Sequence, residues 1–317
     1  MPQDEEDPPR GRPAVSRRTL IGGIVAGAAV VAAASVAGAQ FLPGLLGRSS
    51  DPHPTTPTPT PAPTRSVGDG LLVDQLVRRP GFTVAHRGGS LDWPEMSLEA
   101  YRNSVALGVN ALEISVARTV DGVWFGLHDE TLDRTSGTSG FVAAQHTWKE
   151  VQAFRITAAE TNHRSQAPQP YLRFEDLVAA YGRTHTIFVD PKVVPVSHFG
   201  ELFALMAAVK HPAETFVAKG YCTAQAWPVD AQARGYTTWG YYYGSEIGAD
   251  PTMLPTTKDR WTWLGLDVGA SAEQWQAFTA TGKPVLAHIV RSRDAADQST
   301  TNGAQGLVVS GVREVLA

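Results

Sequence analysis

Residues 82–89, Phe82-Thr83-Val84-Ala85-His86-Arg87-Gly88-Gly89, show the strand pattern on which the fold prediction rests. A short β-rich run, residues 82–85, ends in charged residues, and residues 94–107 then place apolar side chains at helical spacing. The same alternation returns along the chain, and it predicts further strands at residues 111–116, 187–189, 216–218, 237–242, 263–267, 284–289 and 306–309. An open α/β sheet also shows this alternation. Eight strands in about 250 residues favour a TIM (β/α)8 barrel.

The second predicted strand is followed by a break in this alternation. Asp121-Gly122 lies between two strand-like runs, which is the strongest short signal for a hairpin. Residues 123–127 are therefore predicted to run antiparallel to the second strand, outside the barrel. A two-residue turn would set Ser115 opposite His128. We interpret approximately residues 117–183 as an insertion after the second barrel strand.

The composition is that of a folded globular protein. The chain has 317 residues, of which 43% are hydrophobic and 18% charged, and its formal net charge is -4. Because no basic excess is present, nucleic acid is not an expected partner. Cys222 is the single cysteine, so an intramolecular disulfide is excluded, and we expect it to be a buried apolar residue.

Residues 1–47 have the features of a targeting segment. Arg17-Arg18 precedes a long run without charged residues, which is typical of a twin-arginine export signal, and residues 37–39 (Ala-Gly-Ala) fit a cleavage site. The run is also long enough to span a bilayer. The segment is thus either a cleaved signal, which we favour, or a retained membrane anchor. Both alternatives predict that the domain acts outside the cytoplasm.

Two further regions follow this segment. Residues 48–67 are rich in Pro and Thr and are predicted to form an extended, semi-rigid linker. Residues 68–317 are predicted to form the barrel domain.

Polar residues gather at the predicted carboxyl ends of the strands, where barrel enzymes have their active sites. Glu113 and Ser115 are two apart and share one face of a strand. Arginine and lysine can neutralise a phosphate, carboxylates can hold a divalent cation that polarises it, and paired histidines can act as general acid and base. The sequence therefore predicts phosphodiester cleavage by these residues: His86, Arg87, Glu113, Ser115, His128, Asp190 and Lys192.

Several motifs also point to a known family. They are Ala85-His86-Arg87-Gly88, residues 93–98 (WPEMSL), Asp121-Gly122, residues 128–135 (HDETLDRT), residues 170–177 and Val189-Asp190-Pro191-Lys192. With them the domain resembles the glycerophosphodiester phosphodiesterase family along nearly its whole length. The resemblance implies metal-dependent hydrolysis of glycerophosphodiesters to glycerol phosphate and an alcohol. In that family a substrate hydroxyl is thought to attack the phosphate, and water then opens the cyclic intermediate.

The resemblance also implies a role for each residue of the site. His86 and His128 would be the acid/base pair, and Arg87 and Lys192 would bind the substrate phosphate. Glu113 and Asp190 would bind a divalent metal, Ca²⁺ or Mg²⁺. Glu95 would be a carboxylate that orients the groups touching the substrate.

The chain departs from the family at one metal-binding position. The family has Glu-x-Asp where this chain has Glu113-Ile114-Ser115, and a hydroxyl is a weaker ligand for a hard cation than a carboxylate. Ser115 would thus be a weak metal ligand, unless Asp92 or Asp129 supplies the missing carboxylate.

Two other functions stay open besides hydrolysis of a small or lipid-derived phosphodiester. Asp190-Pro191-Lys192 is similar to the pattern of sphingomyelinase D enzymes, which leaves a phospholipase D-like lipid phosphodiesterase possible. Ser115 favours a catalytically weak protein that binds phosphorylated polyols. Trp239, Tyr241 and Tyr243 alternate along one strand, where they would either stack on a headgroup or pack in the core.

Overall fold

The computed structural model describes residues 70–157, 161 and 166–317. The predicted targeting segment and linker lie outside these residues. Within the described residues no helix combines the length and the apolar character needed to cross a membrane.

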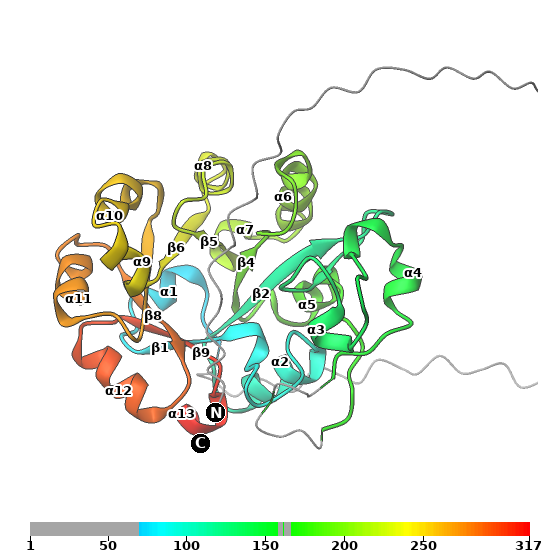
Figure 1. Cartoon of the computed structure of the whole chain (residues 1–317), viewed down its shortest axis with the longest axis horizontal. Helices are drawn as coiled ribbons and strands as arrows, with labels where there is room; N and C mark the ends of the chain where they lie inside the picture. Colours follow the sequence, from blue (N-terminus) through cyan, green and yellow to red (C-terminus); the bar gives the residue numbers. More distant parts are fainter. Residues whose placement is uncertain (1–69, 158–160, 162–165) are drawn as a thin grey trace, which may run out of the picture. The chain divides into compact units, whose positions relative to one another are not determined.

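The domain is a closed barrel of parallel strands (Figure 1). Each barrel strand pairs in parallel with its two neighbours, and β1 pairs with both β2 and β9, which closes the ring. The predicted TIM barrel is confirmed. Its eight strands within the described residues are β1 (Phe82–Ala85), β2 (Ala111–Arg118), β4 (Thr186–Asp190), β5 (Phe216–Tyr221), β6 (Thr237–Tyr242), β7 (Trp263–Asp267), β8 (Val285–Val290) and β9 (Gly306–Val309).

Helices surround the barrel, and most follow a strand (Figure 1). Serine side chains begin three of them by accepting a hydrogen bond from a backbone N–H of the first turn, which satisfies a group that the helix itself leaves unpaired. The longer helices are α2 (Leu98–Ala106), α5 (Phe174–Tyr181), α6 (Phe199–Ala207), α8 (Ala226–Ala233), α11 (Ala272–Thr279) and α12 (Arg293–Thr301). The shorter ones are α1 (Val73–Leu76), α7 (Pro212–Thr215), α9 (Gly244–Ala249), α10 (Met253–Thr257) and α13 (Val312–Leu316).

Two apolar layers result from the alternation of side chains along the strands. One lies between strands and helices and contains Cys222, which is buried as expected. The other fills the barrel and includes Phe82, Phe188 and Trp239. Gly265 leaves room for the Trp239 ring, because a Cβ atom there would lie 2.5 Å from it.

Helix α1 belongs to the filling of the barrel interior. Its Val73 and Leu76 are part of the inner apolar cluster. The preceding Leu71 donates its N–H to Asn110 O and accepts from Thr186 N–H, which places this segment at the amino ends of β2 and β4. Apolar residues thus occupy that end of the barrel, and the charged residues gather at the carboxyl end.

The hairpin after β2 forms as predicted, but the predicted register was wrong by one residue. β3 (Trp124–Gly126) runs antiparallel to β2, with Arg118 opposite Trp124. The turn has three residues instead of two, because Thr119 N–H donates to Val123 O across residues 120–122. Gly122 adopts φ 86°, the left-handed conformation that such turns require.

This register changes the neighbours of Ser115. Its carbonyl oxygen accepts from Leu127 N–H at 3.0 Å, so Leu127 takes the place that had been predicted for His128. His128 follows one position later, at the carboxyl end of the barrel.

The segment beyond the hairpin forms a small apolar cluster of its own. Phe125 of β3 packs against Trp148 of α4 (Trp148–Val151) and against Tyr171, with ring centroids 5.4 and 5.8 Å apart. This cluster supports the turn that carries α3 (Asp133–Ser136). Helix α5 lies within the predicted insertion range, yet its Phe174 and Leu177 pack into the main barrel core.

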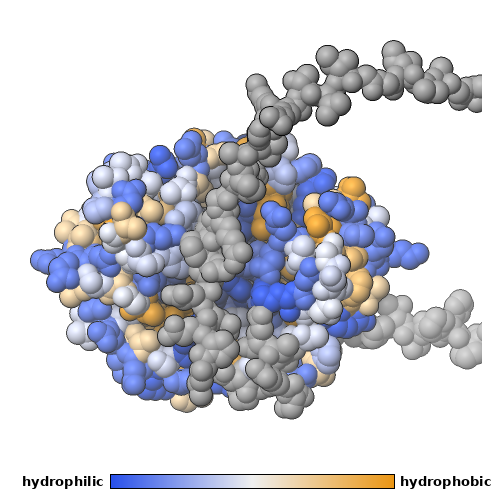
Figure 2. Space-filling model, viewed as in Figure 1, coloured by the Kyte–Doolittle hydropathy of each residue, from blue (hydrophilic) through white to orange (hydrophobic). Residues whose placement is uncertain are grey.

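The surface is mixed in character. On the face shown in Figure 2, hydrophilic residues predominate and hydrophobic ones form scattered patches. Among the described residues, the large hydrophobic side chains that are exposed are the valines at positions 77, 120, 196 and 229.

Candidate active site

A sharp turn after β1 positions His86 and Arg87. The chain leaves the strand through a 3-10 turn, His86–Gly88, in which Arg87 has φ 51° and Gly88 φ 77°. Two features require a glycine at position 88. Its φ is positive, and a Cβ atom there would lie 2.9 Å from Ala100 Cβ. The turn is fixed from the neighbouring strands: His86 Nδ1 lies 2.7 Å from Ser310 Oγ, and Arg87 N–H donates to Glu113 Oε2 at 2.7 Å.

Glu95 holds two guanidinium groups beside this turn. Its Oε2 lies 3.3 Å from Arg87 Nη1, and Arg134 donates to both carboxylate oxygens at 2.7 and 2.9 Å. Burial by itself would raise the pKa of Glu95, but the charges of Arg134 and Arg87 outweigh it and lower that pKa well below its usual range. Glu95 is therefore a buried carboxylate that fixes where both arginines lie.

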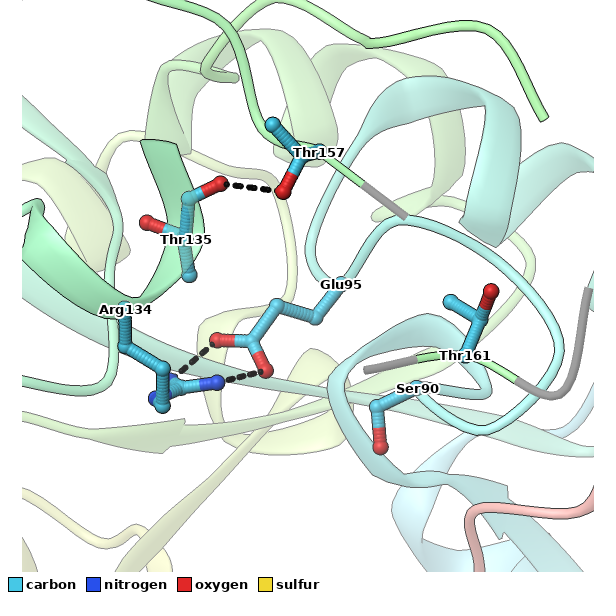
Figure 3. A pocket seen from close by; sticks show the side chains of 6 residues that line it. All are labelled: Ser90, Glu95, Arg134, Thr135, Thr157 and Thr161. Carbon is cyan, nitrogen blue, oxygen red and sulfur yellow. Dashed lines mark hydrogen bonds and ion pairs between the residues drawn. The ribbon is translucent and has the colours of Figure 1, made fainter. Parts of the chain in front are cut away.

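Glu95 and Arg134 also line a small pocket (Figure 3), which has a volume of about 10 Å³, enough to hold about one water molecule. The other lining residues are Ser90, Thr135, Thr157 and Thr161.

His128 is held in one tautomer by its neighbours. Its Nε2 lies 2.7 Å from Lys192 Nζ, and its Nδ1 lies 2.7 Å from Asp129 Oδ1. An ammonium group has only hydrogens to donate, so Nε2 must be the acceptor and Nδ1 must carry the proton that Asp129 receives. In this arrangement Nε2 is directed at the lysine and Nδ1 at the aspartate.

Asp129 is in turn fixed by Arg134, whose Nε donates to Oδ2 at 2.7 Å. Burial by itself would raise the pKa of Asp129, but the hydrogen bond from His128 and the charge of Arg134 lower it to about 2. Asp129 therefore stays ionised and orients the imidazole.

The two carboxylates predicted to bind metal lie side by side on neighbouring strands. β2 and β4 pair in parallel with Ser115 beside Asp190, and Glu113 lies two residues earlier on the same face. Glu113 and Asp190 are 0% and 1% exposed. Lys192 lies above them, with its Nζ 3.5 Å from Asp190 Oδ2.

A lysine that the sequence reading did not identify lies against both carboxylates. Lys219 of β5 is buried, and its Nζ lies 2.8 Å from Glu113 Oε1 and 3.7 Å from Asp190 Oδ2. Burial by itself would raise the pKa of Glu113, but the Lys219 ammonium lowers it to about 2. The same ammonium lies 5.1 Å from the ring centroid of Tyr241 and 5.8 Å from that of Trp239.

Ser115 and the two candidates for the missing metal ligand, Asp92 and Asp129, all form hydrogen bonds with other groups. Ser115 Oγ donates to Glu113 Oε1 at 3.4 Å, and Asp92 Oδ2 accepts from Arg313 N–H at the start of α13. Asp129 is engaged by His128 and Arg134. Among the residues described, no group of three or more His, Cys, Asp or Glu side chains is arranged to hold a metal ion.

These residues do not fit a resident Ca²⁺ or Mg²⁺. Such ions take about six or more oxygen ligands, several of them anionic. Here two carboxylates and one hydroxyl converge, and an ammonium group already lies against both carboxylates.

Three contributors to the site were missed from sequence, namely Lys219, Arg134 and Ser310. Lys219 had a detectable signal: it is the one charged residue of the strand 216–221 and lies two positions after Val217, which faces the barrel interior. The question about the aromatic residues is also partly answered. Trp239 packs in the inner core at 1% exposure, whereas Tyr241 lies beside both Lys219 and Lys192.

Part of the chain matches the model of a known family. The model of the glycerophosphoryl diester phosphodiesterase family matches residues 86–202, a range that contains His86, Glu113, His128 and Lys192. Over this range the chain is similar to that family, and solved structures described as members share its fold. Lys219 lies outside the matched range.

The curated relatives are similar over part of their length. The chain is 42% identical over 61 residues to a glycerophosphodiester phosphodiesterase of Caldanaerobacter subterraneus, covering 19% of this chain and 25% of the relative. It is 36% identical over 113 residues to glycerophosphodiester phosphodiesterase 1 of Mus musculus, covering 34% and 33%. A probable glycerophosphodiester phosphodiesterase 1 of Mycobacterium tuberculosis is 40% identical over 139 residues, covering 44% and 46%. The matches thus span between a quarter and a half of these relatives.

Solved structures of low sequence identity share the fold. A putative glycerophosphoryl diester phosphodiesterase of Silicibacter pomeroyi has a TM-score of 0.59 at 19% identity, covering 75% of this chain and 92% of that one. An Oleispira antarctica phosphodiesterase, determined in complex with the product sn-glycerol-3-phosphate, has a TM-score of 0.57 at 18% identity, covering 74% and 95%.

Proposed function

We propose that this protein hydrolyses glycerophosphodiesters to glycerol phosphate and an alcohol. The observation that carries the proposal is the state of His128. Asp129 fixes the imidazole so that Nε2 is a proton acceptor, and Lys192, a group suited to bind phosphate, lies 2.7 Å from that nitrogen. A general base and a phosphate-binding cation are thus in contact at the carboxyl end of the barrel.

In the proposed reaction His128 Nε2 removes the proton of the attacking oxygen, a substrate hydroxyl next to the phosphate. As that oxygen bonds to phosphorus, the bond to the leaving alcohol breaks, and His86 protonates the departing oxygen. Water then opens the cyclic phosphate with the two roles reversed, so protons balance over the cycle. Arg87 and Lys192 neutralise the phosphate throughout.

Two further points belong to the proposal. The Oleispira antarctica structure contains sn-glycerol-3-phosphate, which is the kind of product proposed here. We also place the reaction outside the cytoplasm, because Arg17-Arg18 and the uncharged run after it have the pattern of an export signal. Metal dependence, which the resemblance implies, is not part of the proposal because the donor set does not fit a resident cation.

Turnover of glycerophosphocholine, followed by phosphorus NMR, tests the function. The wild-type chain should release sn-glycerol 3-phosphate, and His86→Ala and His128→Ala should each lower the rate by at least about 100-fold, the scale of positioned proton transfer. His198→Ala is the matched control, because His198 pairs with Glu201 at the surface and should leave the rate unchanged. Near-normal turnover in either site variant would refute the role assigned to that histidine. Binding of sn-glycerol 3-phosphate without any turnover would instead favour a binding protein.

A further inference from the structure

Lys219 is buried in the barrel interior, next to the carboxylates of the site. It projects from β5 into the barrel, where its side chain is 4% exposed and lies against two buried carboxylates. A buried ammonium is costly unless it is paired, and both of its carboxylate neighbours are the residues expected to bind metal. Lys219 therefore stands at the position where a divalent cation would be held.

The arginine, lysine and carboxylate side chains joined by ion pairs in the site balance in charge when Lys219 is included. In the described part of the chain, ion pairs and hydrogen bonds join four basic and four acidic side chains into one network that also includes His128. They are Arg87, Arg134, Lys192 and Lys219, and Glu95, Glu113, Asp129 and Asp190. The network is thus neutral without a metal ion. An aspartate at position 115 and a neutral residue at position 219 would give it a net charge of -2, which is the charge that one divalent cation cancels.

A divalent cation and Lys219 exclude each other at this position. An ion coordinated by Glu113 and Asp190 lies within about 2.6 Å of their oxygens. The Lys219 ammonium is 2.8 and 3.7 Å from those same side chains, so the two cations would be close neighbours in a buried, weakly screened place. The Trp239 and Tyr241 rings, within 6 Å of the ammonium, add cation–π attraction that stabilises it at this position.

We propose that Lys219 replaces the divalent cation, so that this phosphodiesterase works with a built-in positive charge and without a metal ion. The inference rests on the proposed function and specifies how that site meets the substrate phosphate. Lys219 and Lys192 together offset the charges of Glu113 and Asp190, so the substrate anion meets Arg87 and Lys192 without an uncompensated carboxylate beneath them.

Calorimetry on the full chain tests the first half of this proposal. Ca²⁺, Mg²⁺ and Mn²⁺ are titrated separately, with and without sn-glycerol 3-phosphate. We expect no saturable binding with a Kd below about 1 mM, the weak end of protein calcium sites. Saturable binding that disappears in Glu113→Gln would overturn the proposal, because a metal would then occupy this site.

The converse variant, Ser115→Asp with Lys219→Met, tests the second half. It has the carboxylate that the family pattern requires and lacks the ammonium, so it should gain a saturable divalent-cation site that the wild type lacks. Its turnover of glycerophosphocholine should depend on added metal, whereas turnover by the wild type should be unaffected by EDTA. No gain of metal binding in a folded double variant would contradict the exchange.

Single variants separate a role at the site from a purely structural one. Lys219→Met should lower turnover by about 100- to 1,000-fold, the effect of removing one preorganised group that stabilises transition-state charge. Lys219→Arg keeps the charge and should retain more of the activity. If Lys219→Met is folded and fully active, the proposal is wrong. If it does not fold, Lys219→Arg and the double variant still decide.

Different measurements test the hydrolytic function and the replacement of a cation by Lys219. If the wild type turns over no glycerophosphocholine with or without metal, the proposed function fails. The calorimetric comparison of wild type and double variant still decides whether Lys219 stands in for a cation.

Discussion

The ion pair between Glu113 and Lys219 should make a large contribution to stability, and Glu113→Gln measures it. Glutamine keeps an oxygen that can accept from Arg87 N–H, so the main loss is the charge opposite a buried ammonium. Removing one partner of a buried ion pair costs about 3–5 kcal/mol. Asp190 lies 3.7 Å from the same ammonium and compensates it in part, so we expect a loss of about 3 kcal/mol.

A double-mutant cycle measures the coupling free energy between Glu113 and Lys219 separately from the cost of changing each side chain. The partner variants are Lys219→Met and the combined Glu113→Gln/Lys219→Met, in which neither charge is left unpaired. Because each single variant leaves one buried charge without its partner and the double variant removes both charges, the double variant should lose less stability than either single variant. Glu201→Gln is the matched control: its partner Arg118 is at the surface, so the change should cost less than about 1 kcal/mol.

The assay is urea unfolding of the full chain at neutral pH, with the midpoint and the slope compared among the variants. Two results would refute the reasoning. One is a loss below about 1 kcal/mol for Glu113→Gln, which is the scale of an exposed ion pair. The other is strict additivity of the two single changes, because side chains in contact should be coupled.

Two further predictions concern acid stability and export. Burial raises the pKa values of Glu95 and Asp129, but contacts with arginine and histidine outweigh it, so both pKa values are lowered in the folded state, that of Asp129 to about 2. The two carboxylates therefore contribute stability that is fully present above their ordinary pKa values of 4.5 and 3.8 and is lost as the pH falls below those values. The urea midpoint should therefore decline from about pH 4.5 downwards, and Glu95→Gln should reduce that decline; an unchanged profile would contradict it. Changing both Arg17 and Arg18 to lysine should stop export by the twin-arginine route, and unchanged accumulation outside the cytoplasm, measured by fractionation, would show the assignment to be wrong.

The barrel could be predicted because its signals are local. Each strand is a short β-rich run before a helical stretch, and polar residues after the strands mark the active end. The hairpin register depended on one detail that the sequence did not reveal. Asp121-Gly122 indicates the turn but not its length, and the third turn residue, Val120, shifts every pair by one position.

The residues of the site could be predicted where they belong to recognisable motifs. The prediction was incomplete where they do not. His86, Glu113, Asp190 and Lys192 lie in or directly after parallel strands, and they converge because such strands share their carboxyl edge. Lys219 was missed because the predicted strand ended at residue 218. Its contact with Glu113 joins side chains that are 106 positions apart in the chain and lie on strands that are not neighbours.

Turnover of glycerophosphocholine by the wild-type full chain in excess EDTA tests directly whether the protein hydrolyses its substrate without a metal ion. If the residues of this barrel supply both the acid/base pair and the positive charge, sn-glycerol 3-phosphate should form at the same rate in EDTA as in added Ca²⁺ or Mg²⁺. Turnover that stops in EDTA and returns with either ion would contradict the role of Lys219. The absence of turnover under every condition would contradict the hydrolytic function itself.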